Sequence, residues 1–255
     1  MKRTIKSPAP QLSELKEFNI DLDMTGRHYA QLATSEGQIP EDVALSIIKD
    51  LLEEDASKLT IAELRYLFIL VKINSLENNY NVTIGCTHEV NGKECGCLNH
   101  VKVHLSDGDL NICPKNYKIP EIEFILDEKG TFKKYSVLPP TMAMESALLN
   151  WFMNVKNVTL DAIADDKKTS MEYTFIRSLM HLKEKDGNRL INEINDFEPA
   201  LKYLDFNKYQ TVSKLYDYCN EVDKFGVQNK VYEIKCKECG GLLVYRLPLL
   251  HGLVD

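Results

Sequence analysis

Two short stretches of this chain carry most of the residues whose types and spacing could support chemistry. Five of the seven cysteines lie in them, Cys86, Cys95 and Cys97 in "TIGCTHEVNGKECGCLNHVKVHL" and Cys236 and Cys239 in "EIKCKECGGLLVYRL". Two cysteines separated by two residues in a tight turn can direct both sulfurs at one metal ion, and a following glycine lets backbone N–H groups approach the thiolates. The second stretch therefore has the pattern of half of a tetrahedral metal site.

The stretch around Cys95 repeats the pattern around Cys239. Cys95-Gly-Cys-Leu aligns with Cys239-Gly-Gly-Leu, an alternating run follows each, and Cys86 and Cys236 precede them. In the first copy "THEVNGKE" separates the two cysteines, which indicates an insertion into the knuckle. Because tetrahedral zinc needs four ligands and thiolate-rich sites are closed and structural, we expect one structural Zn²⁺ between two hairpins, as in a zinc ribbon. The expected ligands are Cys86, Cys236, Cys239 and either Cys95 or Cys97, with His88 or His100 as a replacement for one thiolate.

The remaining cysteines and histidines fit less specific roles. Cys219 falls within a helical stretch among tyrosines and Cys113 precedes a proline in a loop, so both are interpreted as small buried residues. A redox role for the CxxC pair is disfavoured because a thioredoxin-type pair begins a helix, whereas this pair lies between strands. His100 and His104 share one face of an alternating run and could hold an ion together, but an exposed or hydrogen-bonded pair is the commoner outcome.

Composition and motifs narrow the classes of function. The chain has no GxSxG elbow, HExxH motif or phosphate-binding glycine loop, which favours a protein that is not an enzyme. Its formal net charge is −7 with acids and bases interleaved, so we do not expect a surface for nucleic acid. No apolar run approaches the roughly 20 residues of a membrane span, and the N-terminus lacks the apolar core of a signal peptide. We expect a cytoplasmic protein, in which an odd set of seven cysteines argues against a disulfide framework.

The elements that must position the cysteines are predicted to form an α+β fold, in the order helices, hairpins, helices, hairpin. Residues 1–38 are expected to be an extended polar arm with at most a short helix near 12–18, and to order on a neighbouring subunit. A helix is predicted to begin at Pro40, with acidic residues in its first turn. Thr60 and Glu63 match a capping box at the start of "ELRYLFILVKI", which is apolar nearly all round and predicts a buried central helix.

Alternating runs predict three β-hairpins. The first covers 80–105 and turns at its Asn-Gly dipeptide, the second covers 121–138 and turns at Gly130, and the third covers 230–247. Between the last two, helices are predicted in "TMAMESALLNWFMNV", "SMEYTFIRSLMHLKEK", "GNRLINEINDF" and "YQTVSKLYDYCNEVDKFG". The third hairpin is expected to return to the first. The predicted regions are 1–38 (arm), 39–140 (helices and hairpins), 141–226 (helical) and 227–255 (terminal hairpin).

The order of these motifs resembles one known family. The helix "LTIAELRYLFILVKINSLENNY" leads into a β run with cysteines, a strand pair runs into "LPPT", and a helical part precedes a late CxxCG followed by "LPLL". This pattern, from about residue 40 to 250, resembles the T4-type bacteriophage baseplate hub family, tail-assembly proteins of contractile-tailed phages. In that family the first knuckle looks like a compact CxxC, and aromatic residues tend to follow the last strand where this chain has "LLHGLVD".

The resemblance implies a non-enzymatic role in building the central hub of a phage tail baseplate in the host cytoplasm. The partners it implies are other tail and baseplate hub proteins, and the protein would be either a virion component or a late assembly factor. Two rival functions share some of the same residues. A zinc-ribbon nucleic-acid-binding regulator would need a basic face and salt-sensitive binding. A zinc hydrolase using His100 and His104 would need an open coordination position.

Overall fold

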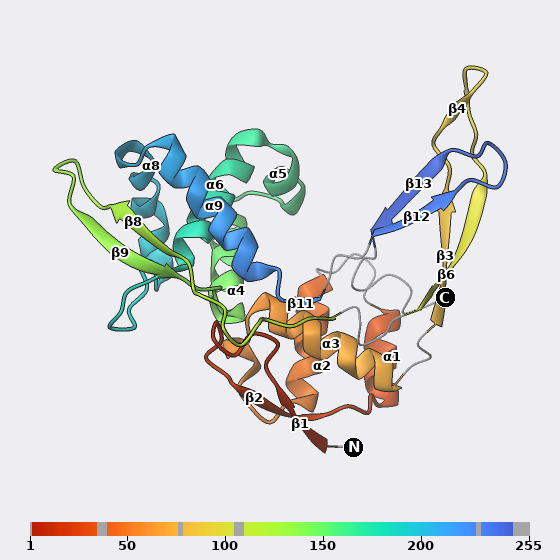
Figure 1. Cartoon of the computed structure of the whole chain (residues 1–255), viewed down its shortest axis with the longest axis horizontal. Coiled ribbons are helices and arrows are strands. Elements are labelled where there is room, and N and C mark those ends of the chain that lie inside the picture. Colours follow the sequence, from red (N-terminus) through yellow and green to blue (C-terminus); the bar gives the residue numbers. More distant parts are fainter. Residues whose placement is uncertain (1, 35–39, 76–78, 105–109, 228–230, 247–255) are drawn as a thin grey trace.

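The computed structural model describes residues 2–34, 40–75, 79–104, 110–227 and 231–246. It combines helices with small antiparallel sheets, so the predicted α+β class is confirmed. Three clusters of buried side chains divide it into an N-terminal body, a helical body and a pair of cysteine-bearing hairpins. The hairpins stand apart from the other two bodies (Figure 1). Within the described ranges, no helix is long and apolar enough to cross a bilayer.

The N-terminal body begins with an antiparallel hairpin in which Ile5 lies opposite Phe18. Phe18 and Ile20 are fully buried and belong to the same core as residues of the two long helices that follow. The elements of this body are β1 (Lys2–Lys6), β2 (Glu17–Asp21), α1 (Gly26–Ala33), α2 (Pro40–Leu51), a short 3-10 helix (Ala56–Lys58) and α3 (Ile61–Ser75).

The prediction of an extended polar arm is therefore wrong for residues 2–34, and the helix predicted near 12–18 is a turn followed by β2. The residues 35–38 of the predicted arm lie outside the described ranges. "EFNID" alternates, which places Phe18 and Ile20 on one face of a strand. Two apolar residues are too few to distinguish a strand from a polar arm by pattern alone, and burial in the tertiary core decides.

The predicted buried helix and its capping box are confirmed in α3. The backbone N–H of Thr60 donates to the Glu63 carboxylate at 3.0 Å, and the backbone N–H of Glu63 donates to the Thr60 hydroxyl at 3.2 Å. The Ser7 hydroxyl also donates to Glu63 at 2.7 Å. This buried carboxylate therefore ties the start of α3 to the end of β1.

The helical body packs six helices and a π-helical turn against a three-stranded antiparallel sheet. The second predicted hairpin is confirmed as β8–β9, and Gly130 in its turn has φ +78°. Because Phe124 and Tyr135 of that hairpin share a core with Phe175, the hairpin belongs with the helices after residue 140. The elements are β8 (Glu121–Ile125), β9 (Phe132–Val137), α4 (Met142–Asn150), a π-helix (Trp151–Val155), α5 (Leu160–Asp165), α6 (Lys167–Met180), β10 (Leu182–Lys183), a 3-10 turn (Ile194–Asp196), α7 (Phe197–Ala200), α8 (Tyr203–Phe206) and α9 (Tyr209–Asp223).

One helix predicted in this body is wrong over most of its length. Residues 187–193 of "GNRLINEINDF" form bends and an isolated bridge, and helical structure begins only at Ile194. Arg189 explains why an extended backbone is stable here. Its guanidinium donates to the carbonyl oxygens of Leu138, Met180 and Pro139 at 2.7 to 3.1 Å, which fixes the segment across the ends of β9 and α6.

A partly buried ion network joins α4, α6 and α9. Arg177 contacts the carboxylates of Glu145 at 2.7 Å and Asp223 at 2.9 Å. His181 is fully buried, with Nε2 at 3.1 Å from Asp223 and Nδ1 at 3.0 Å from the Arg177 carbonyl oxygen. Burial by itself would lower the pKa of His181, but the Asp223 carboxylate outweighs it and raises the pKa to about 10. The imidazole is therefore charged at neutral pH.

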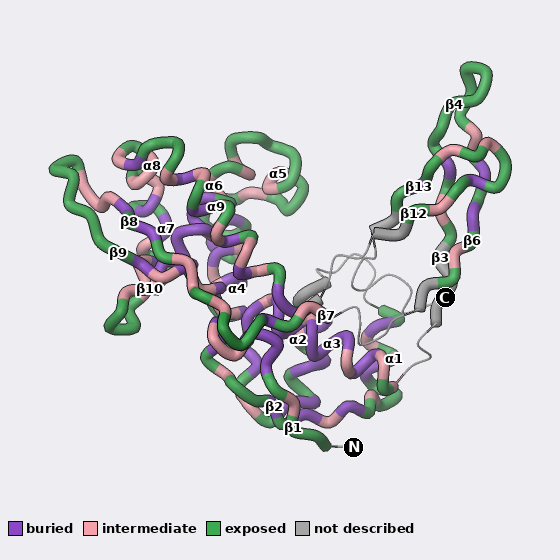
Figure 2. The backbone as a smooth tube through the Cα atoms, in the orientation of Figure 1, coloured by how far each residue is buried: buried purple, intermediate pink, exposed green. Residues whose placement is uncertain are grey.

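The two bodies are joined through a short sheet between β7 (Leu110–Asn111) and β11 (Gly226–Val227), which follows α9. Gly226 has φ +124°, and a Cβ atom there would lie 2.4 Å from the carbonyl oxygen of Ala62 in α3. Only glycine allows this approach. The last long helix is predicted to stop at Gly226, but α9 ends at Asp223 and Gly226 is the first residue of β11. Figure 2 shows buried positions concentrated in the two bodies, whereas the far end of the cysteine hairpins is exposed.

Candidate metal centre

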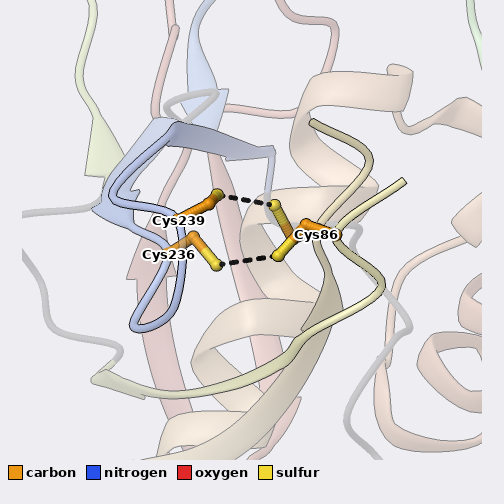
Figure 3. A group of neighbouring side chains, drawn as sticks. Cys86, Cys236 and Cys239 are labelled. Carbon is orange, nitrogen blue, oxygen red and sulfur yellow. Dashed lines mark hydrogen bonds between the residues drawn. The ribbon is translucent and has the colours of Figure 1, made fainter. Parts of the chain in front are cut away.

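The cysteine-bearing hairpins form where the sequence predicts them. β3 (Asn79–Gly85) pairs with β6 (Leu98–His104), and β12 (Val231–Lys235) pairs with β13 (Leu242–Arg246), both antiparallel. The third predicted hairpin is thereby confirmed over its described residues, while 228–230 and 247–255 lie outside them. One hairpin precedes the helical body in the sequence and the other follows it. Their cysteine-bearing ends face one another (Figure 3).

Four cysteine sulfurs gather between the two hairpins. The Sγ atoms of Cys86, Cys95, Cys236 and Cys239 all lie within 4.8 Å of one another. Cys86 is 3.5 Å from Cys239, and Cys95 is 3.8 Å from Cys236, so each close pair crosses from one hairpin to the other. A tetrahedral zinc ion with Zn–S distances of about 2.3 Å holds its sulfurs about 3.8 Å apart. The sulfur spacing therefore matches the size of a tetrahedral thiolate site.

The second knuckle has the backbone needed to aim two sulfurs at one point. The N–H of Cys236 donates to the Gly241 carbonyl at 2.8 Å, and the N–H of Gly240 donates to the Cys236 carbonyl at 2.9 Å. Gly240 has φ +70°, a conformation that favours glycine, and the Gly241 N–H lies 3.4 Å from the Cys239 sulfur. This tight turn is the one predicted from the CxxCG motif.

The first knuckle repeats this backbone despite its insertion. The N–H of Cys86 donates to the Cys97 carbonyl at 2.9 Å, the N–H of Gly96 donates to the Cys86 carbonyl at 2.9 Å, and Gly96 has φ +62°. Cys95 thus corresponds to Cys239, as the sequence alignment predicts. Cys97 corresponds to the glycine two residues after Cys239 and supplies a carbonyl oxygen to the turn.

This correspondence settles which cysteine joins the group. Cys95 is one of the four gathered sulfurs, and Cys97 is not among them. Cys97 is buried, burial raises the pKa of its thiol, and its sulfur lies 3.8 Å from the Leu98 carbonyl oxygen. Of the two alternatives that the sequence leaves open, the geometry selects Cys95.

The insertion closes on itself as a small hairpin. β4 (Glu89–Val90) pairs with β5 (Lys93–Glu94) across Asn91 and Gly92, whose φ angles of 52° and 75° are those of a tight hairpin turn. At its base the N–H of Cys95 donates to the His88 carbonyl at 2.8 Å. The inserted residues therefore leave the knuckle and return to it. This allows Cys86 and Cys95 to take the positions of a CxxC pair although eight residues separate them in the sequence.

The histidines considered as replacement ligands lie outside the four-sulfur group. His88 is beside it, with Nδ1 3.4 Å from the Cys86 sulfur, and its ring lies against the backbone of Gly241. His100 is exposed and bonds Thr83 Oγ1 at 3.0 Å. The backbone of His104 is part of β6, but its side chain is not among those described.

The two cysteines interpreted as small buried residues are buried in the helical core. Cys113 and Cys219 are each 4% exposed, and both belong to the same cluster of apolar side chains. The sulfur of each lies 3.8 Å from a carbonyl oxygen, that of Pro114 for Cys113 and that of Ser178 for Cys219. The interpretation from sequence is therefore confirmed for both.

The surroundings of the four sulfurs favour thiolates unequally. Backbone N–H groups, first that of Cys239 and then that of Glu238, outweigh burial and lower the pKa of Cys236 to about 5. Burial raises the pKa of Cys86 to about 12. A divalent cation would supply the positive charge that a buried set of four thiolates requires.

Asn99 is a residue of the site that sequence reasoning missed. It is buried on the inner face of β6, where Nδ2 donates to the Cys97 carbonyl at 3.0 Å and lies 3.7 Å from the Cys236 sulfur. Its Oδ1 accepts from the Lys237 N–H at 3.0 Å, so one side chain bridges the hairpins. The signal in the sequence was a polar residue at an inward position of an alternating run.

The four-cysteine group is the main internal feature of the paired hairpins. The apolar residues packed around the cysteines are few: Ile84, Ile234 and Leu243. A two-stranded hairpin is marginally stable in water by itself, so this small core needs a further link between its halves. No protein-family model, curated protein sequence or solved structure matches the chain, so its function has to be argued from these residues and their geometry.

Proposed function

We propose that Cys86, Cys95, Cys236 and Cys239 bind one structural Zn²⁺ that clamps the two hairpins together. The observation that carries this proposal is the group of four sulfurs within 4.8 Å of one another, drawn from segments on both sides of the helical body. Four thiolates complete a tetrahedral zinc shell and leave no position for a water or substrate, which favours a structural ion over a catalytic one.

Metal analysis of the purified protein tests the clamp. Native mass spectrometry in the presence of a weak chelator should give one zinc per chain for the wild type, and loss of the ion in Cys95→Ser. Cys97→Ser is the matched control, since that cysteine lies two residues away and outside the sulfur group, and it should retain the zinc. Less than about half an equivalent in the wild type, or equal loss in both variants, would contradict the proposal.

We further propose that the protein is a non-enzymatic tail-assembly factor or baseplate hub component of a contractile-tailed phage, acting in the host cytoplasm. The support is the resemblance carried by "AELRYLFILVKINSL", the cysteine knuckles and the terminal CxxCG. A metal clamp that joins distant segments suits a protein whose surface is its function, because it fixes shape without chemistry.

Association with tail proteins tests this role. The tagged full-length protein should retain hub or tape-measure proteins of a contractile-tailed phage in a pull-down at physiological salt. Failure to retain any of them would contradict the assembly role while leaving the zinc clamp intact. Binding to DNA that weakens steeply with salt would favour a nucleic-acid-binding zinc ribbon instead.

A further inference from the structure

The N-terminal hairpin leaves one edge of β1 without a neighbouring strand among the described residues. β1 pairs only with β2, and the N–H of Ser7 donates to the Lys16 carbonyl at 2.9 Å. Hydrogen-bonded and non-hydrogen-bonded pairs alternate along an antiparallel ladder. The N–H and C=O groups of Thr4 and Lys6 therefore point away from β2, toward the outer edge of the hairpin.

The opposite edge of the same hairpin is covered. Ile20 of β2 forms a bridge with Leu52, and the N–H of Glu53 donates to the Asn19 carbonyl at 2.9 Å. The carboxylate of Glu54 accepts from the Asn19 N–H at 2.9 Å. The outward N–H and C=O of Asn19 are thus satisfied within the chain. In β1 no described residue bonds the outward backbone groups of Thr4 and Lys6, which leaves that edge available to an added strand.

A groove of about 600 Å³ runs beside this open edge. One wall is formed by residues of β1, and the other is a face of α3 on which the lining residues recur at helical spacing. Ile112, at the rim, is 54% exposed. The groove is lined by Arg3, Thr4, Ile5, Leu22, Tyr66, Leu70, Ile73, Asn74 and Ile112.

The side chains at the groove specify what an added strand should carry. Ile5 and Arg3 lie opposite the buried Phe18 and Ile20, so both are on the inner face of β1, toward the core and α3. A strand paired to β1 would place one side chain beside Ile5, against the apolar part of the groove. Two residues along it would place another side chain beside the guanidinium of Arg3, where a carboxylate is complementary.

We propose that this groove binds an extended segment of a partner protein as a third strand, antiparallel to β1, with an apolar residue, any residue and then an acidic residue. Main-chain hydrogen bonds to Thr4 and Lys6 would provide the affinity, and the apolar and acidic side chains the selectivity, which is the mode known as β-augmentation. The site is in the N-terminal body and does not depend on the metal centre.

A peptide titration of the ¹⁵N-labelled full-length protein tests this. The probe is the capped peptide Gly-Ser-Thr-Val-Thr-Glu-Thr-Ser-Gly, and the control has Lys in place of Glu. The Glu peptide should shift the amide signals of Thr4, Ile5 and Lys6 and slow the hydrogen exchange of the Thr4 amide. The Lys peptide should bind more weakly.

Variants of Thr4 and Arg3 distinguish strand pairing from non-specific peptide binding. Thr4→Pro removes the outward N–H but keeps the β1–β2 ladder, and should weaken the Glu peptide about two- to twelvefold, as expected for one hydrogen bond. Thr4→Val is its control, because both lose the hydroxyl bond to Asn19 and only the proline loses the donor. Arg3→Glu should reverse the preference, so that the Lys peptide binds better than the Glu peptide.

Three results would overturn the proposal. One is the absence of shifts or protection at β1 with 1 mM Glu peptide. Another is an unchanged preference in Arg3→Glu. The last is sedimentation showing that the wild type dimerises and that Thr4→Pro is monomeric, which would make the occupant β1 of a second copy rather than a partner's segment.

Discussion

The helical body and the cysteine hairpins solve the same problem of stability in different ways. The core of the helical body contains more than twenty buried side chains, including Phe124, Phe152 and Phe175 with almost no exposure. The corresponding cluster in the hairpin pair has only four buried members, three cysteines and one leucine. Apolar burial can hold the first together, whereas the second depends on a few specific contacts and, as we propose, on a metal ion.

Polar groups also serve the two regions differently. In the helical body the buried His181 and Glu145 and the partly buried Arg177 and Asp223 neutralise one another beside a large apolar core. Among the described side chains of the hairpins, the buried polar groups are thiols and the bridging amide of Asn99. The difference indicates that a core of this size tolerates charges that are paired, while the small module relies, as we propose, on a metal ion held by its cysteines. Four experiments test whether the two regions are stabilised in these different ways.

The largest effect should follow Cys236→Ser. Removing one of four ligands should release the ion and unfold both hairpins, because structural zinc contributes about 10 kcal/mol or more to small metal-dependent folds. Amide exchange should show loss of protection in β3, β6, β12 and β13, with the helical body unchanged. If only the turn between 236 and 239 loses protection, the clamp does not hold the module together. Cys97→Ser should leave all four strands protected.

Phe175→Ala tests the other region. Deleting a fully buried aromatic ring from the helical core should lower the free energy of unfolding by about 3–5 kcal/mol. The fluorescence of Trp151, the single tryptophan, reports this core during denaturant unfolding. Zinc content should stay at the wild-type value. Loss of zinc together with the core would show that the two regions are one cooperative unit, against the comparison.

Raising the pH should weaken the helical body through His181. Its folded pKa of about 10 lies above the usual 6.5, so its stabilisation is complete below about pH 6.5 and is lost as pH rises through about 10. Denaturant unfolding followed by Trp151 should give a free energy that falls over this range, and His181→Gln should flatten the fall. A free energy that rises over the same range would contradict the assigned charge. The metal centre should respond in the opposite direction, since acid protonates thiolates and releases the ion.

The smallest effect should follow Asn99→Ala. It leaves the N–H of Lys237 without its Asn99 acceptor and should cost about 0.5–1.5 kcal/mol in the hairpin module, as expected for one hydrogen bond. Titration with a competing chelator should show weaker zinc binding, with all four sulfurs still able to bind. Asn99→Asp is the matched variant, because it keeps the acceptor while adding a charge near thiolates. If both variants bind zinc as the wild type does, the amide bridge has no part in holding the hairpins together.

Much of the fold is readable from local patterns. The capping box at Thr60, the left-handed turn at Gly130 and the CxxCG knuckle all appear where the sequence predicts them. Each depends on residues within a few positions of one another, so propensity and hydrogen bonding within the segment decide the outcome. The segments whose secondary structure was predicted wrongly are those in which the local sequence pattern is weak or is overridden by tertiary contacts. β2 has two apolar residues, and 187–193 has helix-forming residues but is held extended by the bonds of Arg189.

The candidate site also has features that local sequence specifies and features that depend on tertiary contacts. The sequence by itself determined that two knuckles exist and that their glycines follow the second cysteine, because the motif is local and repeats. It left Cys95 and Cys97 as alternatives. Only the tertiary structure decided between them, because the inserted hairpin returns Cys95 to the ligand position and the turn uses the carbonyl of Cys97. The bridge from Asn99 likewise needs the two hairpins face to face, which no local pattern specifies.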